Sequence, residues 1–265
     1  MAKPKARQYL QRYGQEDIRL DAFAIKKMGL QQSETTLKID NFIIICAPFQ
    51  VSMSKAVLFV ILRKEELPFF QHYTLKLAVL KFTFQKKNIP LKFFVYVKIN
   101  KLIPLKGRQD MAMIDVSYKN CPEDLIITLG DYLSEMESIR QYYNKFKSKQ
   151  ILINNDNARK LRFNNYVECI IGERKIESRL LNMTVELLTL VVPGIDPNLK
   201  VGSEIGAKLY FQIYRFTVKG TVVKLASGSG GFVKLIMRIP FSPELADIVR
   251  DFFSDDHLVS IPQTS

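Results

Sequence analysis

Apolar and polar residues alternate in short runs through much of the first half of the chain. A period of two is typical of strands that turn one face to a core and the other to solvent. Pro68, Pro90 and Pro104 lie between these runs, where a residue without a backbone N–H does not interrupt pairing. Short strands at this spacing predict an antiparallel barrel or sandwich. The expected strands lie near residues 37–46, 55–63, 73–84, 91–99 and 109–117.

A helical pattern follows these strands. Pro122, Glu123 and Asp124 are suited to a first turn, because proline needs no hydrogen-bond acceptor there and acidic side chains favour the positive end of the helix dipole. We expect this helix to run to about residue 147, with Gly130 as a weak point. Its apolar positions are Leu125, Ile126, Leu129, Leu133, Met136 and Ile139.

The second half of the chain repeats this order. A second strand series ends near residue 239, and Pro243 and Glu244 then open an amphipathic helix. Asp196–Asn198 and Ser227–Gly231 punctuate the series, the latter as a hairpin loop. Two strand series, each closed by a helix, predict two similar barrel-plus-helix domains in a mainly β fold. The expected strands lie near 164–171, 174–181, 185–192, 205–215, 218–226 and 231–239.

The domain organisation predicted from these patterns has five parts. They are a lead-in with one helix that ends at Gly29 (1–32), a β-barrel domain (33–120), a helix and basic linker (121–150), a C-terminal β-barrel domain with its closing helix (151–254) and a tail (255–265).

Charge favours an anionic partner. Thirty-nine Lys and Arg against 26 Asp and Glu give a net charge of +13, which suits a nucleic acid, a nucleotide or an acidic membrane face, although it also serves solubility. The three cysteines lie far apart without a CxxC pair, and Cys46 and Cys169 stand in apolar runs typical of buried thiols, which indicates a reducing compartment. The N-terminus has no apolar signal core and no apolar run is long enough to span a bilayer, so we expect a cytoplasmic protein.

Catalytic signatures are absent from the sequence. It contains no GxSxG or HExxH motif, and His72 and His257 stand far apart without acidic partners. The glycines at 228–231 lack the Lys-Ser/Thr pair and the helix of a phosphate loop. We therefore expect no enzyme activity, no catalytic residues, no metal site and no cofactor.

The candidate site lies around the first strand of the second series. Arg159, Lys160 and Arg162 precede that strand, and Asn182 and Thr184 follow about twenty residues later. Guanidinium groups can bind phosphate oxygens or a guanine edge in pairs and can stack on a base. Amide and hydroxyl groups on a strand can supply short polar contacts.

These residues resemble the signature of PilZ domains, small β-barrels that bind cyclic di-GMP. That signature is RxxxR before the first strand and D/N-x-S-x-x-G after it. Arg162 matches the second arginine and Asn182 the Asn/Asp, with Thr184 in place of Ser. Ala158 stands at the first arginine position and Leu187 at the glycine, which implies weakened ligand binding.

The resemblance implies a fold and a function. The chain is similar to the two-domain PilZ proteins of spirochaetes, in which a PilZ-like N-terminal domain without the signature precedes a signature-bearing one. Such a protein would be a non-catalytic cyclic di-GMP effector in second-messenger control of motility or virulence, acting on an unknown protein partner. Arg159, Lys160 and Arg162 would hold phosphate and guanine, Asn182 and Thr184 would contact base or ribose, and the 149–162 segment would become ordered on binding.

Two alternatives stay open. One is a PilZ-like interaction scaffold that no longer binds the nucleotide. The other is a nucleic-acid-binding protein that uses the basic residues 138–162, whose Tyr142, Tyr143 and Phe146 could stack on bases. The same aromatic residues could instead pack the helix onto a barrel.

Overall fold

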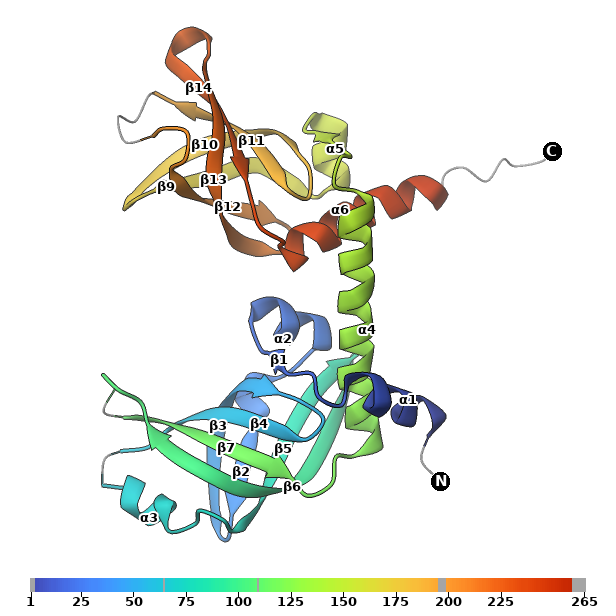
Figure 1. The fold of residues 1–265 in the computed structure, drawn as a ribbon, viewed down its shortest axis with the longest axis vertical. Helices are drawn as coiled ribbons and strands as arrows, with labels where there is room; N and C mark the ends of the chain where they lie inside the picture. The colour runs from blue at the N-terminus through green and yellow to red at the C-terminus, as the bar shows by residue number, and fades with distance from the viewer. Residues whose placement is uncertain (1–2, 64, 109, 195–198, 259–265) are drawn as a thin grey trace, which may run out of the picture. The chain divides into compact units, whose positions relative to one another are not determined.

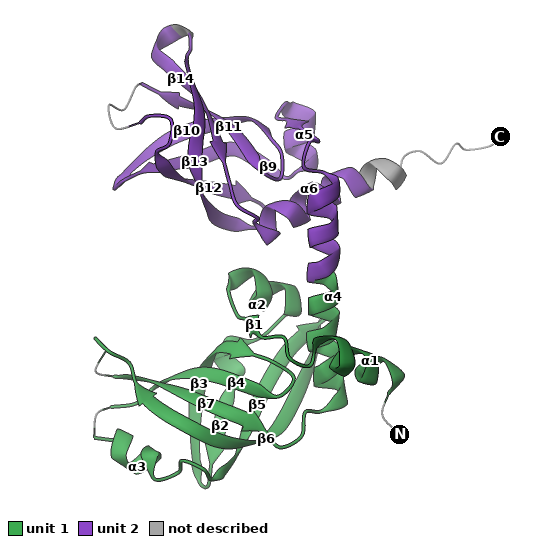
Figure 2. Ribbon diagram, in the orientation of Figure 1, with its two compact units in different colours: residues 1–135 green, residues 136–265 purple. Residues whose placement is uncertain are grey.

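The computed structural model describes residues 3–63, 65–108, 110–194 and 199–258. Contacts between Cα atoms divide the chain into two compact units, residues 1–135 and 136–265 (Figure 2). Each unit contains its own cluster of buried apolar side chains. A separate core is the defining property of a domain.

The first unit is a closed six-stranded barrel. Its strands follow the order β3–β2–β5–β6–β7–β4, and β4 pairs again with β3 (Figure 1). Outside the six barrel strands, the two-residue strand β1 (Ile18–Arg19) pairs with β3. The barrel strands are β2 (Thr36–Ile39), β3 (Phe42–Val51), β4 (Lys55–Ile61), β5 (Leu77–Lys86), β6 (Ile89–Pro104) and β7 (Met111–Tyr118). Closure confirms the barrel and rules out the sandwich for this unit.

Three details of the first strand series were predicted wrongly. Residues 37–46 form a hairpin rather than one strand, because Asp40 adopts a left-handed φ of 49° and reverses the chain. The strand expected from residue 73 begins only at Leu77, after a short helix, α3 (Leu67–Gln71). Pro90 and Pro104 lie inside β6, near its two ends, where a missing N–H is tolerated. Residue 109, at the start of the fifth expected strand, lies outside the described residues.

The lead-in holds two helices where one was predicted. They are α1 (Pro4–Tyr13) and α2 (Ala22–Met28), and a 3-10 turn, η1 (Gln32–Glu34), follows. The Asp21 carboxylate caps α2 by accepting a hydrogen bond of 2.8 Å from the Ala24 N–H. Gly29 ends α2 with a φ of 70°, so the predicted stop is confirmed.

The long helix α4 (Glu123–Lys145) agrees with the prediction. It passes through Gly130 without a break, so this glycine is no weak point. A Cβ built on Gly130 would overlap the side chain of Tyr9 from α1. The glycine therefore serves close packing between two helices of the first unit.

The second unit is also a closed six-stranded barrel, in the order β11–β14–β13–β12–β9–β10 with β10 paired to β11. Numbered within its unit, each barrel has the same cyclic order, 1-2-3-6-5-4, which confirms the predicted internal similarity. The elements are β8 (Ile151–Leu152), α5 (Asn155–Lys160), β9 (Phe163–Ile171), β10 (Arg174–Met183), β11 (Leu187–Pro193), β12 (Glu204–Phe211), β13 (Arg215–Ser227), η2 (Ser229–Gly231), β14 (Phe232–Arg238) and α6 (Pro243–Leu258).

Helix α6 closes the second barrel as predicted. Leu245 and Val249 are fully buried in the core of this unit. The expected hairpin loop between β13 and β14 is confirmed and contains η2. The predicted turn at Asp196–Asn198 lies outside the described residues, as do the side chain of His257 and most of the tail.

Candidate functional site

The segment before the second barrel is held by side-chain caps. The Asn154 side chain accepts a hydrogen bond of 2.8 Å from the Asn157 N–H and so begins α5. The Asn157 amide in turn donates to the carbonyl oxygen of Leu152 at 2.8 Å. Arg159 and Lys160 occupy the last turn of this short helix. Their backbone is therefore fixed by bonds at the start of α5.

Arg162 adopts an unusual backbone conformation directly before β9. Its φ is 51°, a left-handed value that costs a non-glycine residue on the order of 1 kcal/mol. Its N–H donates to the Arg159 carbonyl at 3.0 Å, and its carbonyl accepts from the Gln212 N–H at 2.9 Å. These bonds maintain the strain and present an exposed arginine side chain.

Lys160 and Arg162 line one surface pocket of about 290 Å³. Its other walls come from the turn between β12 and β13, including Tyr214, and from α6. Lys160 Nζ lies 4.4 Å from the centre of the Phe252 ring, a cation–π contact. Arg159 is exposed and does not line this pocket. The structure thus brings two of the three predicted basic residues together.

A buried acid, Asp247, that bonds to Tyr214 of this pocket was missed by the sequence prediction. The Tyr214 hydroxyl donates to Asp247 Oδ2 at 3.0 Å, and Arg250 Nη2 donates to Asp247 Oδ1 at 2.6 Å. Asp247 is only 1% exposed. Burial raises the pKa of Tyr214, and the Asp247 carboxylate raises it further. The sequence did contain a signal for this buried acid, because Asp247 stands between the apolar Ala246 and Ile248 of an amphipathic helix.

Asn182 lies near the end of β10, and Thr184 lies in the turn between β10 and β11. Asn182 is half-buried and is paired with Leu152 of β8 and Thr189 of β11. Thr184 is 9% exposed, and its hydroxyl oxygen accepts from the N–H groups of Glu186 at 3.1 Å and Leu187 at 2.9 Å. The Thr184 oxygen therefore stabilises the turn, and the hydroxyl retains its proton for donation.

The two parts of the candidate site lie at different ends of α5. Near the start of α5, the Asn157 side chain bonds to Leu152, which is the strand partner of Asn182. The last turn of α5 carries Arg159 and Lys160. Neither Asn182 nor Thr184 lines the pocket of Lys160 and Arg162.

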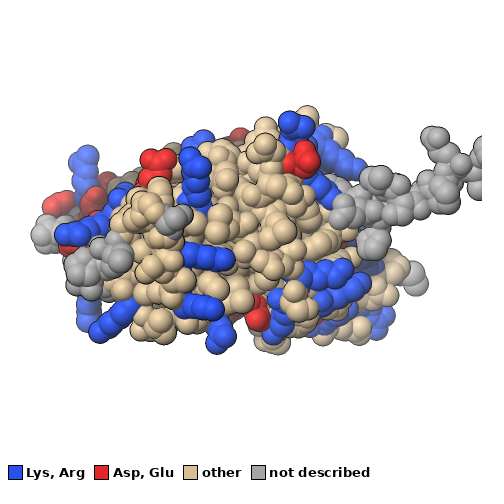
Figure 3. Space-filling view, turned by 90° about the horizontal axis from the view of Figure 1, so that it is seen from above, with Lys and Arg blue, Asp and Glu red and all other residues tan. Residues whose placement is uncertain are grey.

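The aromatic residues of the basic 138–162 segment pack within the second unit. Phe146 is 4% exposed and stacks on Phe253, and the Tyr143 hydroxyl donates to Glu186 Oε1 at 3.0 Å. Lys147 forms an ion pair of 3.1 Å with the same carboxylate. On the face seen in Figure 3, Lys and Arg are spread out rather than gathered in one patch. This packing favours a structural role for the aromatic residues over base stacking.

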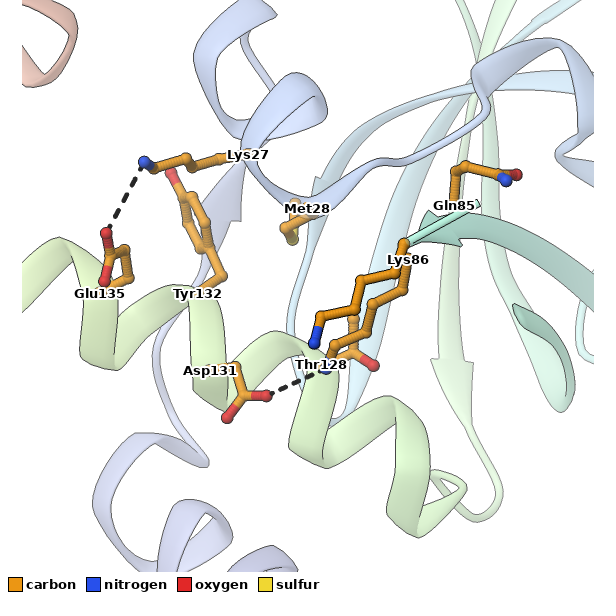
Figure 4. A pocket seen from close by; sticks show the side chains of 9 residues that line it. Lys27, Met28, Gln85, Lys86, Thr128, Asp131, Tyr132 and Glu135 are labelled. Atoms are coloured by element: carbon orange, nitrogen blue, oxygen red, sulfur yellow. Dashed lines mark ion pairs between the residues drawn. The ribbon is translucent and has the colours of Figure 1, made fainter. Parts of the chain in front are cut away.

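A pocket in the first unit contains two ion pairs. It measures about 440 Å³ and lies between α2, α4 and the end of β5. Lys27 and Glu135 are 3.7 Å apart, and Lys86 and Asp131 are 3.5 Å apart (Figure 4). Two of its three lysines, Lys27 and Lys86, are thus neutralised by carboxylates, and Lys87 also lines the pocket.

Neither a cluster of metal ligands nor a membrane-spanning helix is found in the described part of the chain. No three His, Cys, Asp or Glu side chains there gather as a metal ion would require. No helix within the described ranges is both long and apolar enough to cross a bilayer.

Comparisons with known proteins identify a domain family. Residues 5–136 match the model of the PilZN3 domain. Among solved structures, the chain resembles Borreliella burgdorferi PlzA in complex with c-di-GMP, with 14% identity, a TM-score of 0.44 and coverage of 94% of this chain and 98% of that one. It also resembles the c-di-GMP complex of K. pneumonia MrkH, with 10% identity, a TM-score of 0.32 and coverage of 94% and 100%. The Bacillus subtilis inhibitor of motility MotI is also similar, with 11% identity, a TM-score of 0.30 and coverage of 87% of this chain and 99% of that one.

No curated protein matches the sequence. The domain match covers α1, the entire first barrel and the first part of α4, and the second barrel repeats the strand order of the first. Residues 5–136 are therefore identified as a PilZN3 domain.

Proposed function

We propose that the chain is a non-catalytic regulator that binds cyclic di-GMP at the second barrel. Arg159, Lys160 and Arg162 bind phosphate and guanine, and Asn182 and Thr184 add polar contacts. The proposal rests on the signature resemblance of these residues and on the PilZN3 family of the first barrel. Control of motility or virulence through a protein partner in the cytoplasm is the function we infer for such a regulator.

The observation that carries the proposal is the conformation of Arg162. A strained backbone is retained only where surrounding contacts enforce it, and such residues cluster at functional sites. Here the strain directs a guanidinium group to a pocket that also receives Lys160. Two cations at one recess suit an anionic ligand.

Binding would change side-chain contacts more than backbone structure. Residues 151–160 already form β8 and α5 without ligand, so we propose no folding of this backbone. Lys160 lies over Phe252 of α6, and a phosphate that attracts Lys160 would weaken this contact. The nucleotide would thereby act on α6 and on a partner that reads its position.

Two departures from the signature predict weak binding. Ala158 provides no guanidinium at the first arginine position, and the neighbouring Arg159 compensates only in part. Leu187 begins β11 with a half-buried side chain where a glycine would permit close approach. We therefore expect a lower affinity than two matched arginines and a glycine would give.

The test is calorimetric titration of the full chain with cyclic di-GMP, beside Arg159→Ala and Arg162→Ala. Lys219→Ala, on an exposed position of β13, is the matched control for loss of one positive charge. We expect saturable binding whose affinity falls about tenfold or more in the two arginine variants, because loss of a charge-assisted hydrogen bond costs roughly 1.5–3 kcal/mol. The affinity of Lys219→Ala should equal that of the unaltered chain.

If the chain gives a folded circular dichroism spectrum but does not bind cyclic di-GMP, the proposal is wrong. The alternative of an interaction scaffold without nucleotide is then favoured. Equal loss in all three variants would indicate a general charge effect. If a generic oligonucleotide binds with an affinity that falls steeply with salt, the nucleic-acid alternative gains support.

A further inference from the structure

Large apolar side chains are exposed on the outer face of the first barrel. Ile43 and Ile45 of β3 are 67% and 68% exposed, and Phe94 and Tyr96 of β6 are 59% and 63% exposed. Monomeric proteins seldom expose contiguous groups of this kind without an interaction to serve. The proposed nucleotide site, in the other unit, does not use these residues.

Strand register makes these residues one continuous surface. Residues opposite one another on paired strands lie about 5 Å apart on the same face. Two adjacent rows cross β6, β5, β2 and β3, and we call their eight residues the outer band: Tyr96, Val79, Lys38 and Ile43 in one row, and Phe94, Lys81, Thr36 and Ile45 in the other. The outer band therefore extends across four of the six strands of the barrel.

The charge of the outer band is entirely positive. It includes Lys38 and Lys81, and Lys98 lies beside it, opposite the exposed Leu77. Lys81 is 4.0 Å from Glu34, whereas no carboxylate among the described residues pairs with Lys38. Residues 36–118 as a whole carry thirteen Lys or Arg against five Asp or Glu. The apolar surface is thus embedded in positive potential.

The positions of the lysines favour a lipid surface over a protein. Centres of protein interfaces are depleted of charged residues, and of lysine in particular. Here Lys38 lies between Val79 and Ile43, within the row rather than at its rim. In a membrane interface such a lysine can bury its aliphatic stem and extend its ammonium group to lipid phosphates, while Phe and Tyr rings enter the headgroup region.

We propose that the outer band binds the surface of membranes that contain anionic lipids. The barrel lies on the membrane through Ile43, Ile45, Phe94 and Tyr96, and Lys38 and Lys81 contact lipid phosphates. This contact is peripheral and needs no nucleotide. Each lysine near an anionic surface contributes on the order of 1 kcal/mol, so apolar and charged residues are both required.

The experiment is co-sedimentation of the full chain with phosphatidylcholine vesicles, with and without phosphatidylglycerol. We expect sedimentation only with the anionic vesicles. Ile43→Ser with Ile45→Ser, and separately Lys38→Gln with Lys81→Gln, should lower the partition coefficient about tenfold or more. Two pairs on the second barrel are matched controls and should bind as the unaltered chain does: Leu181→Ser with Phe232→Ser, and Lys219→Gln with Lys234→Gln.

Thermal unfolding of each variant separates loss of binding from loss of fold, because exposed positions should change stability little. No sedimentation with anionic vesicles, or equal loss in the control pairs, overturns the proposal. A concentration-dependent dimer in sedimentation velocity that disappears with Ile43→Ser and Ile45→Ser would also overturn it, since a second copy would then cover the outer band.

Discussion

Arg162 shows how one residue can combine strain with a candidate role. A left-handed φ of 51° disfavours any side chain with a Cβ, yet hydrogen bonds to Arg159 and Gln212 hold it. A glycine would fit this backbone better, so the arginine is retained against local preference. This conflict supports a function for the side chain rather than for the fold.

Glycine at this position tests that argument. Arg162→Gly should leave the free energy of unfolding unchanged or raise it by up to about 1 kcal/mol, because relief of strain offsets the entropy of glycine in the unfolded chain. Arg162→Ala keeps the Cβ and should not gain stability. Urea denaturation compares the two, and clear destabilisation by glycine would show that the arginine side chain stabilises the fold.

At the scale of elements, α1 is attached to α4 by contacts around Gly130. Tyr9 packs over the glycine, and its hydroxyl donates to Asp131 Oδ1 at 3.0 Å. Lys5 Nζ lies 2.7 Å from the same carboxylate. Burial raises the pKa of Asp131, but the hydrogen bonds from Lys5 and Tyr9 outweigh it and lower the pKa. Shape and charge therefore fix α1 together.

Substitution of Gly130 separates helix propensity from packing. Gly130→Ala should raise the intrinsic stability of α4 by about 1 kcal/mol, yet the new methyl group collides with Tyr9 and should displace α1. We expect faster hydrogen exchange in residues 4–13, and Tyr9→Ala in the same chain should remove the penalty. Unchanged exchange in α1 would show that the helices adjust without separating.

At the scale of the molecule, the chain consists of two barrels with the same strand order and separate cores. Leu80 in β5 and Leu190 in β11 are both fully buried, one in each core. Each unit has its own cluster of buried apolar side chains, so we expect the stability of each unit to depend mainly on its own core. Two unfolding transitions are the physical consequence.

Matched core variants test this independence. Leu80→Ala and Leu190→Ala should each cost about 2–5 kcal/mol, and each should lower the midpoint of a different transition in calorimetry. If either variant shifts a single common transition, the two units unfold together.

The alternating pattern by itself determined most of the strands, the two closing helices and the repeat of one architecture. These features depend on the local period of apolar residues and on the positions of proline and glycine. Both are properties of residues that are close together in the sequence. The basic cluster 159–162 and the Asn182–Thr184 pair were also visible as residue types at a spacing. Their assignment to cyclic di-GMP came from resemblance and stays a proposal.

Only the tertiary structure decided features that depend on distant residues or on a single dihedral angle. The hairpin at Asp40, the bonds of Thr184 to its own turn and the burial of Asp247 beneath Tyr214 have no periodic signal. The outer band likewise required strand register, because its two rows join residues from four strands. Sequence periodicity states which face of a strand is apolar, whereas barrel closure and register decide which faces meet.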